Sequence, residues 1–117
     1  MFLWRWVMGS IHQWSKTASE AAQLLGLEIA RARKERRWTA VELSERAGIT
    51  AVTLRKVERG DPTVALGTVF EVATLVGVHL FGVEREALPD LIVRVQSRLA
   101  LLPTRVRESS GMVHDDF

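Results

Sequence analysis

The stretch from residue 38 to residue 60 constrains the fold most, because hydroxyl caps and glycine stops alternate within it. Its sequence is WTAVELSERAGITAVTLRKVERG. Thr39 is followed three residues later by a glutamate, which is the capping-box pattern of a helix start. Gly48 fits the position after a helix end, where a left-handed backbone is needed. Thr50 then caps a further segment that Gly60 ends. The pattern predicts two short helices joined by a tight turn.

Apolar residues recur at helical spacing before and after this stretch. We expect a first helix at about 18–36, opened by a capping box at residues 17–20, with Gly26 marking a bend or a close helix crossing. A fourth helix is expected at about 66–75. The inward positions are predicted to be Ala21, Leu24, Leu25, Ile29 and Ala32 in the first helix, Val41, Leu43 and Ala47 in the second, Leu54 and Val57 in the third, and Leu66, Val69, Phe70, Ala73 and Val76 in the fourth.

The C-terminal part predicts one short strand and one further helix. Residues 78–83, VHLFGV, favour a strand, and a lone strand cannot satisfy its own backbone groups. We therefore expect it to pair with the same strand of a second subunit. Residues 90–102 predict a helix after Pro89. The residues expected to form a dimer contact are Val78, Leu80, Phe81, Leu91, Val95 and Leu99.

Composition narrows the classes of protein. The chain of 117 residues suits one domain, 47% of it is hydrophobic, and it has no cysteine that could form a disulfide or bind a metal. Its formal net charge is +2. No run of about 18 apolar residues predicts a membrane span. No phosphate-binding loop, nucleophile elbow or zinc-protease motif is present. We expect a cytoplasmic protein that is not an enzyme and uses no cofactor or metal.

We expect four segments along the chain. Residues 1–16 form an N-terminal extension, 17–83 a helical domain with its strand, 84–103 a C-terminal helix, and 104–117 a flexible tail. The apolar prefix at residues 1–10 has two interpretations. Either translation starts more naturally at Met8, or the prefix is a patch that docks on a partner.

Residues 25–78 resemble the Cro/C1-type (Xre) helix-turn-helix family. The matching pieces are EIARARKERRWT, ELSERAGIT and TLRKVERGDPTVALGTVFEVATLVGV. The resemblance implies a mainly all-α, five-helix domain. Within the family the chain looks most like HipB-like antitoxins, because of LFG after the fourth helix and the tail ending in DDF. It departs from the family at Ala40, where a glutamine usually braces the recognition helix on a phosphate.

The resemblance also implies the roles of individual residues. It places Ala51, Val52, Arg55 and Lys56 toward the DNA groove, and spacing agrees because Leu54 and Val57 take the opposite face. Arg55 is the best guanine reader, since its two N–H groups match guanine O6 and N7. The candidates for phosphate contacts are Thr39, Thr50, Arg59, Thr63, Arg36 and Arg37.

Two structural roles complete the site expected from sequence. Arg33 and Glu58 are implied to form an ion pair that ties the first helix to the recognition helix. Trp38 is expected to fill the corner between the first two helices. The alternative for each charged residue is an ordinary solvated position on a helix or turn.

Three functions remain open at this point. The first is a homodimeric repressor of a palindromic operator on double-stranded DNA, with recognition helices about 34 Å apart. In its fuller form the protein is an antitoxin that also binds a HipA-like kinase toxin. The second is a stand-alone Xre regulator without a toxin. The third is a protein-interaction adaptor that has lost DNA binding, which Ala40 and the apolar pair Ala51-Val52 would allow.

Overall fold

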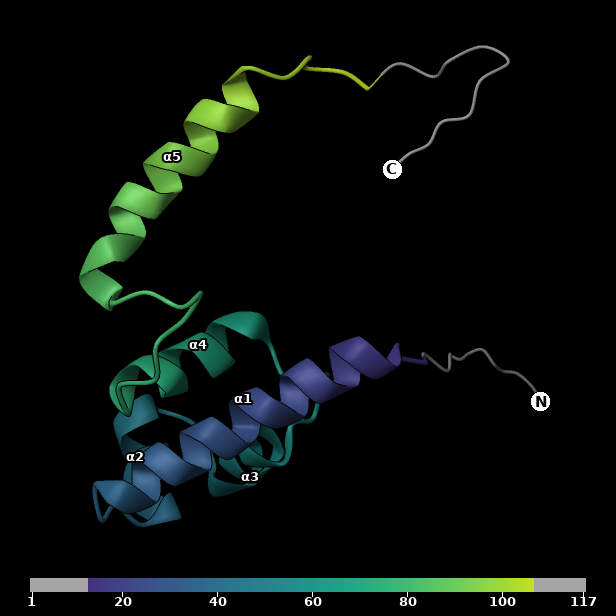
Figure 1. The fold of residues 1–117 in the computed structure, drawn as a ribbon. Helices are drawn as coiled ribbons and strands as arrows, with labels where there is room; N and C mark the ends of the chain where they lie inside the picture. The colour runs from purple at the N-terminus through teal and green to yellow at the C-terminus, as the bar shows by residue number, and fades with distance from the viewer. Residues whose placement is uncertain (1–12, 107–117) are drawn as a thin grey trace, which may run out of the picture. The chain divides into compact units, whose positions relative to one another are not determined.

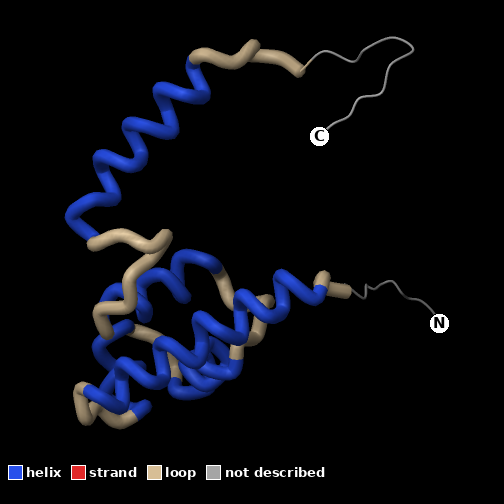
Figure 2. The backbone as a smooth tube through the Cα atoms, in the orientation of Figure 1, coloured by secondary structure: helices blue, strands red, loops and turns tan. Residues whose placement is uncertain are grey.

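The computed structural model describes residues 13–106, and every regular element in that part of the chain is helical (Figures 1 and 2). The mainly all-α fold expected from sequence is confirmed. The chain divides into two units, whose described parts are residues 13–79 and 80–106. The first unit holds α1 (Lys16–Glu35), α2 (Ala40–Ala47), α3 (Ala51–Arg59) and α4 (Leu66–Leu75), and the second holds the 3₁₀ turn η1 (Arg85–Ala87) and α5 (Leu88–Ala100).

One small core holds the four helices of the first unit together. In Figure 1 the long helix α1 runs across the shorter helices, and it packs mainly on α3, while α2 packs on α3 and α4. Each helix contributes one large side chain with no exposed surface: Ile29, Leu43, Leu54 and Val72. Burying such a side chain stabilises a fold by about 1.5–3 kcal/mol relative to exposure. These four residues therefore fix where α3 stands.

The capped turns of the central helices form as the sequence predicts. The Thr39 hydroxyl accepts a hydrogen bond from the Glu42 N–H (3.0 Å), and the Glu42 carboxylate accepts one from the Thr39 N–H (2.7 Å). Thr50 caps α3 in the same way through the N–H of Thr53 (3.0 Å). Gly48, with φ of 71°, ends α2 in the left-handed conformation. The capping residues therefore set both ends of the turn between α2 and α3.

The predicted starts of the first and last helices were wrong. Ser15, rather than Thr17, caps α1, because its hydroxyl accepts from the Ala18 N–H (3.1 Å) and the helix begins at Lys16. The capping box expected at residues 17–20 therefore does not form. The last helix begins at Leu88, so Pro89 lies inside its first turn. Proline is tolerated there because the first N–H groups of a helix have no partner within it.

Four apolar residues predicted to face inward are exposed: Ala21, Leu24, Val41 and Leu66. Leu24 is 60% exposed, Val41 55% and Leu66 67%. Val41 lies two positions before the buried Leu43, about 200° around the helix, so both cannot face the core. Leu66 lies at the start of α4, where it lines an open apolar cleft with residues of α1 and of the loop before α4. The sequence pattern therefore overstated the size of the core.

The strand predicted at residues 78–83 does not form in the structure. The N–H of Val78 bonds the carbonyl oxygen of Ala73 (2.9 Å), which engages it in the end of α4. Phe81 and Gly82 then both have positive φ, 59° and 70°, and the N–H of Val83 bonds the Leu80 carbonyl (3.3 Å). Two successive positive φ angles reverse the chain in a turn of the I′ kind. A tight turn replaces the strand, leaving one isolated antiparallel bridge between Leu80 and Val83.

No α5 residue is buried, and α5 packs within its unit on η1. None of the helices in residues 13–106 combines the length and apolar character needed to cross a membrane. The apolar prefix at residues 1–10 and the end of the tail at 107–117 lie outside the described part of the chain. The expectations for these two segments therefore stay predictions.

Candidate nucleic-acid interface

Helix α3 presents a basic face and buries an apolar one. Leu54 has no exposed surface and Val57 is 3% exposed, so these two side chains anchor the helix in the core. Arg55, Lys56 and Arg59 are exposed, and Val52 is 55% exposed. Of the four residues implied to contact bases, only Ala51 is partly covered. The structure thus brings three cations together on the exposed side of one short helix.

Glycine allows α1 and α3 to approach with almost no space between their backbones. A Cβ atom added at Gly26 would lie 2.6 Å from the carbonyl oxygens of Val57 and Glu58. Gly60, the C-cap of α3, lies similarly close to the backbone of Gln23. The sequence left open a bend or a close crossing at Gly26, and the structure has the crossing, with α3 as the partner helix. These contacts hold the C-terminal end of α3 against α1.

An ion pair adds a second tie at the same end of α3. Arg33 Nε lies 2.7 Å from Glu58 Oε2, and Arg33 Nη2 lies 3.0 Å from Glu58 Oε1, so the guanidinium meets the carboxylate at two points. The two side chains are only 11% and 15% exposed. The hydrogen bonds to Glu58 raise the pKa of Arg33 above its ordinary value, although partial burial opposes the shift. The pair implied by the family resemblance is therefore present as a half-buried, two-point contact.

The remaining nitrogen of Arg33 links this pair to the corner between α1 and α2. Nη1 donates to the Trp38 carbonyl oxygen (3.0 Å). Trp38 itself is half-buried, with the guanidinium carbon of Arg46 4.2 Å from its ring centroid and that of Arg36 5.5 Å away. Arginine stacked on an indole gains cation–π attraction. Trp38 therefore fills the corner as expected, with two arginines on it that the sequence pattern did not indicate.

Some of the candidates for phosphate contacts already make side-chain hydrogen bonds within the described part of the protein, and others do not. The hydroxyls of Thr39 and Thr50 accept capping hydrogen bonds. Thr63 donates through both its hydroxyl (2.6 Å) and its N–H (2.9 Å) to Asp61 Oδ1, which lowers the pKa of Asp61. Arg59 is exposed at the last position of α3. The hydrogen bonds of Thr63 therefore stabilise the turn after α3, whereas the Arg59 side chain is exposed on the basic face of α3.

Arg36 has a structural role that the sequence interpretation missed. Its Nε donates to the carbonyl oxygen of Val76, the C-cap of α4 (2.9 Å), and its Nη2 would lie 2.7 Å from a Cβ added at Gly77. A cation at a helix C-terminus is favourable because the last carbonyls carry partial negative charge. The neighbouring Arg37 is exposed, with a φ of 62°. Nothing in the local sequence pattern indicated this contact, because its partner lies 40 positions away.

The start of α2 carries small and apolar side chains. Ala40 is exposed, and Val41 is 55% exposed beside it. The first N–H groups of a helix have no partner within the helix, and they attract anions. The N–H groups at this helix end are therefore the donors that could replace the missing glutamine side chain.

Comparison with known families gives one match. Residues 29–83 match the helix-turn-helix family model. The matched range covers α2, α3, α4 and the last third of α1, and it includes the Arg33–Glu58 ion pair, whereas Gly26 lies just before it. The match indicates a DNA-binding domain of the type found in transcription regulators. Comparison with curated proteins gave no match, and comparison with solved structures gave none either.

Proposed function

We propose that the protein is a sequence-specific transcription regulator that binds its operator as a homodimer and represses transcription. The observation that carries the proposal is the exposed row of Arg55, Lys56 and Arg59 on a helix held to α1 by a glycine crossing and an ion pair. A rigid support keeps base-reading side chains in one geometry. The helix-turn-helix match supports the same interpretation.

The side chains of α3 suggest how the groove would be read. Arg55 can donate two parallel hydrogen bonds to guanine O6 and N7, the commonest specific contact to a base edge. The exposed Val52 offers an apolar surface that suits a thymine methyl group. Arg59 and the N–H groups at the start of α2 are suited to phosphates, which fix register without reading sequence.

The small size of this reading surface favours a homodimer. α3 has nine residues, and one such helix presents only a few side chains to the bases. Two copies that place their recognition helices about 34 Å apart would double the contacts and read a palindrome. The residues that we propose for the dimer contact outside the first unit are Leu80, Phe81, Leu91, Val95 and Leu99.

The antitoxin role is a narrower part of this proposal, and its support is the sequence resemblance alone. The segment Leu80-Phe81-Gly82 forms a turn, and the closing residues 115–117 lie outside the described part of the chain. A HipA-like kinase would be the partner. Co-expression of such a kinase with the full chain, followed by co-purification at high salt, tests this part. Absence of a stable complex favours the stand-alone regulator.

Selection of DNA by the full chain tests the main proposal. Binding to a pool of random duplexes, followed by sequencing, should enrich one palindromic sequence. Arg55→Ala, as the matched control, should enrich the same palindrome with one position relaxed in each half. Affinity for the selected duplex should also fall steeply with salt, since each phosphate contact releases counterions. No enriched sequence, together with a flat salt dependence, would favour the adaptor function.

A further inference from the structure

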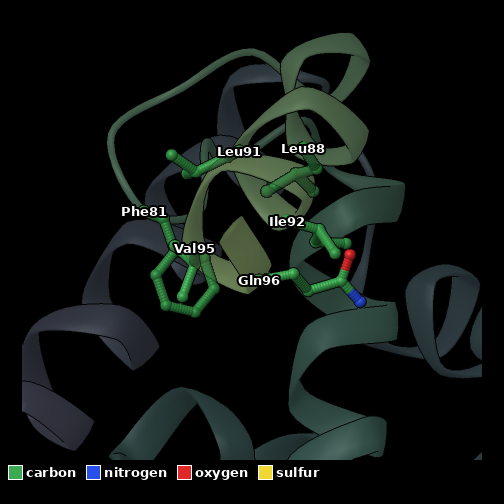
Figure 3. A pocket seen from close by; sticks show the side chains of 6 residues that line it. All are labelled: Phe81, Leu88, Leu91, Ile92, Val95 and Gln96. Atoms are coloured by element: carbon green, nitrogen blue, oxygen red, sulfur yellow. The ribbon is translucent and has the colours of Figure 1, made fainter. Parts of the chain in front are cut away.

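Helix α5 and the turn that follows it carry an apolar seam with the spacing of a coiled coil, the last position of which lies just after the helix. Its positions are separated by four, three, four and three residues: Leu88, Ile92, Val95, Leu99 and Leu102. This alternation is the a/d pattern that seats side chains between those of a facing helix. Figure 3 shows Leu88, Ile92 and Val95 around one apolar groove, together with Phe81 and Leu91. The apolar residues of the second unit therefore form one continuous surface along α5.

Most of this seam is open in the single chain. Ile92 is 55% exposed, Val95 47%, Leu99 65% and Leu102 62%. Phe81, at the tip of the turn before α5, is 73% exposed. A contiguous apolar surface of this kind marks an interaction site in a water-soluble domain. The question is which partner it fits.

We propose that α5 pairs with α5 of a second copy of this chain, in the antiparallel direction. A helix with an a/d seam is complementary to itself, because the same knobs and holes recur on both partners. In the antiparallel register that uses α5 from end to end, Leu88 faces Leu99 of the second copy. Ile92 then faces Val95 of the second copy. Four apolar layers result, all inside the helix.

Helix dipoles favour the antiparallel direction, because the positive N-terminal end of each helix then lies near the negative C-terminal end of its partner. The ends of α5 also differ in charge, with Asp90 in the first turn and Arg98 in the last. An antiparallel pair brings these unlike ends together, whereas a parallel pair brings like ends together. Asp90 lies one heptad before Ser97, on the side away from the seam, so this preference comes from the charge of the ends and not from a direct ion pair across the seam.

This inference deepens the homodimer of the proposed function and rests on it, but it can fail separately. The seam spans only about two heptads, so we expect a dimer that dissociates at low concentration. Two operator half-sites would hold two copies close together and favour the same pairing, because tethering raises their effective concentration. The apolar seam is therefore expected to couple dimer formation to operator binding.

Disulfide trapping in the full chain tests the direction of pairing. The chain has no cysteine, so Leu88→Cys and Leu99→Cys each introduce a single thiol. A disulfide requires Cα atoms within about 7 Å. Eleven residues of helix separate the two positions by about 16 Å along the axis. Mild oxidation of the mixed variants at high protein concentration should yield the mixed 88–99 disulfide as the main product. Oxidation of either variant alone should yield little cross-linked dimer.

The alternatives give different products. Preferential 88–88 and 99–99 disulfides would show a parallel pair and overturn the antiparallel proposal. Ser97→Cys, on the opposite side of α5, is the matched control for random collisions. A mixed product no faster than this control would overturn pairing through α5. If operator binding with its dependence on Arg55 persisted in that case, the regulator proposal would stand and only this inference would fail.

Discussion

Gly26 of α1 packs directly on the backbone carbonyl of Glu58 in α3, so closely that a methyl group at Gly26 would lie 2.6 Å from that oxygen. The carboxylate of the same glutamate is held by Arg33, about two helical turns further along α1. The backbone and the side chain of Glu58 are thus both fixed by α1. This arrangement makes the end of α3 rigid, and the first two predictions follow from it.

We predict that Gly26→Ala lowers the free energy of unfolding by about 1–3 kcal/mol, because the added methyl overpacks the crossing against backbone that cannot move aside. Gly67→Ala is the matched control, since a Cβ there meets nothing within 4 Å in α4. It should leave stability unchanged or raise it by up to about 1 kcal/mol. Urea denaturation of both variants measures the difference. Equal effects at the two positions would contradict the tight crossing.

Arg33→Ala should destabilise the fold by about 1.5–3 kcal/mol, because the half-buried Glu58 carboxylate and the Trp38 carbonyl lose charged donors. Arg33→Lys keeps the charge but cannot make the two-point contact, so its cost should fall between that of Arg33→Ala and zero. A double-mutant cycle with Glu58→Ala should show a clear coupling energy. Additive losses would mean that the pair contributes nothing beyond its separate side chains.

Arg55→Ala should weaken binding to the selected operator by about 1–3 kcal/mol and relax preference at one base pair in each half-site. Stability should change little, because Arg55 is exposed on α3. Lys16→Ala removes the same charge from the start of α1 and serves as the control for general electrostatics. Fluorescence anisotropy with matched and mismatched duplexes measures both. Identical losses in the two variants would remove Arg55 from base readout.

Arg36 and Arg37 form a natural comparison, because only the first caps α4 through the Val76 carbonyl. Arg36→Ala should lower stability by about 1 kcal/mol, since a charged donor leaves a helix C-terminus. Arg37→Ala should change stability by less than about 0.5 kcal/mol, as is usual for an exposed residue. Urea denaturation measures both changes in stability. Operator affinity is then compared under conditions where both variants are fully folded. Equal losses of affinity would mean that the two arginines contribute equally to DNA binding.

The Asp61 carboxyl should titrate below its ordinary pKa of 3.8, because the Thr63 hydroxyl and N–H bond to it and Lys56 and Arg59 lie near. A depressed pKa in the folded state means that the contribution to stability is complete above the unfolded pKa. That contribution is lost as pH falls through the lower, folded value. Thr63→Val removes the hydroxyl, the largest cause, and should raise the pKa of Asp61. Carbon-detected NMR titration measures the shift. An unchanged pKa would show that the hydroxyl bond is absent in solution.

Local sequence determined the helices of the first unit and the turn between α2 and α3. Thr39, Thr50, Gly48 and Gly60 act through contacts within a few residues, so their patterns can be read without knowing the fold. The buried pair Leu54 and Val57 likewise fixed which side of α3 faces outward. The basic face of the candidate site was predictable for this reason.

Tertiary structure alone decided the contacts between distant segments. Gly26 contacts the backbone of Glu58, and Arg36 donates to the carbonyl of Val76, which lies 40 positions later. A local sequence pattern cannot predict such partners. The strand expected at residues 78–83 became a turn because the end of α4 engages the N–H of Val78 and the chain reverses at Phe81. Backbone groups take the partners that packing brings within reach, and packing depends on the whole chain. Local propensity therefore set the helices, while long-range contact set how the reading helix is held.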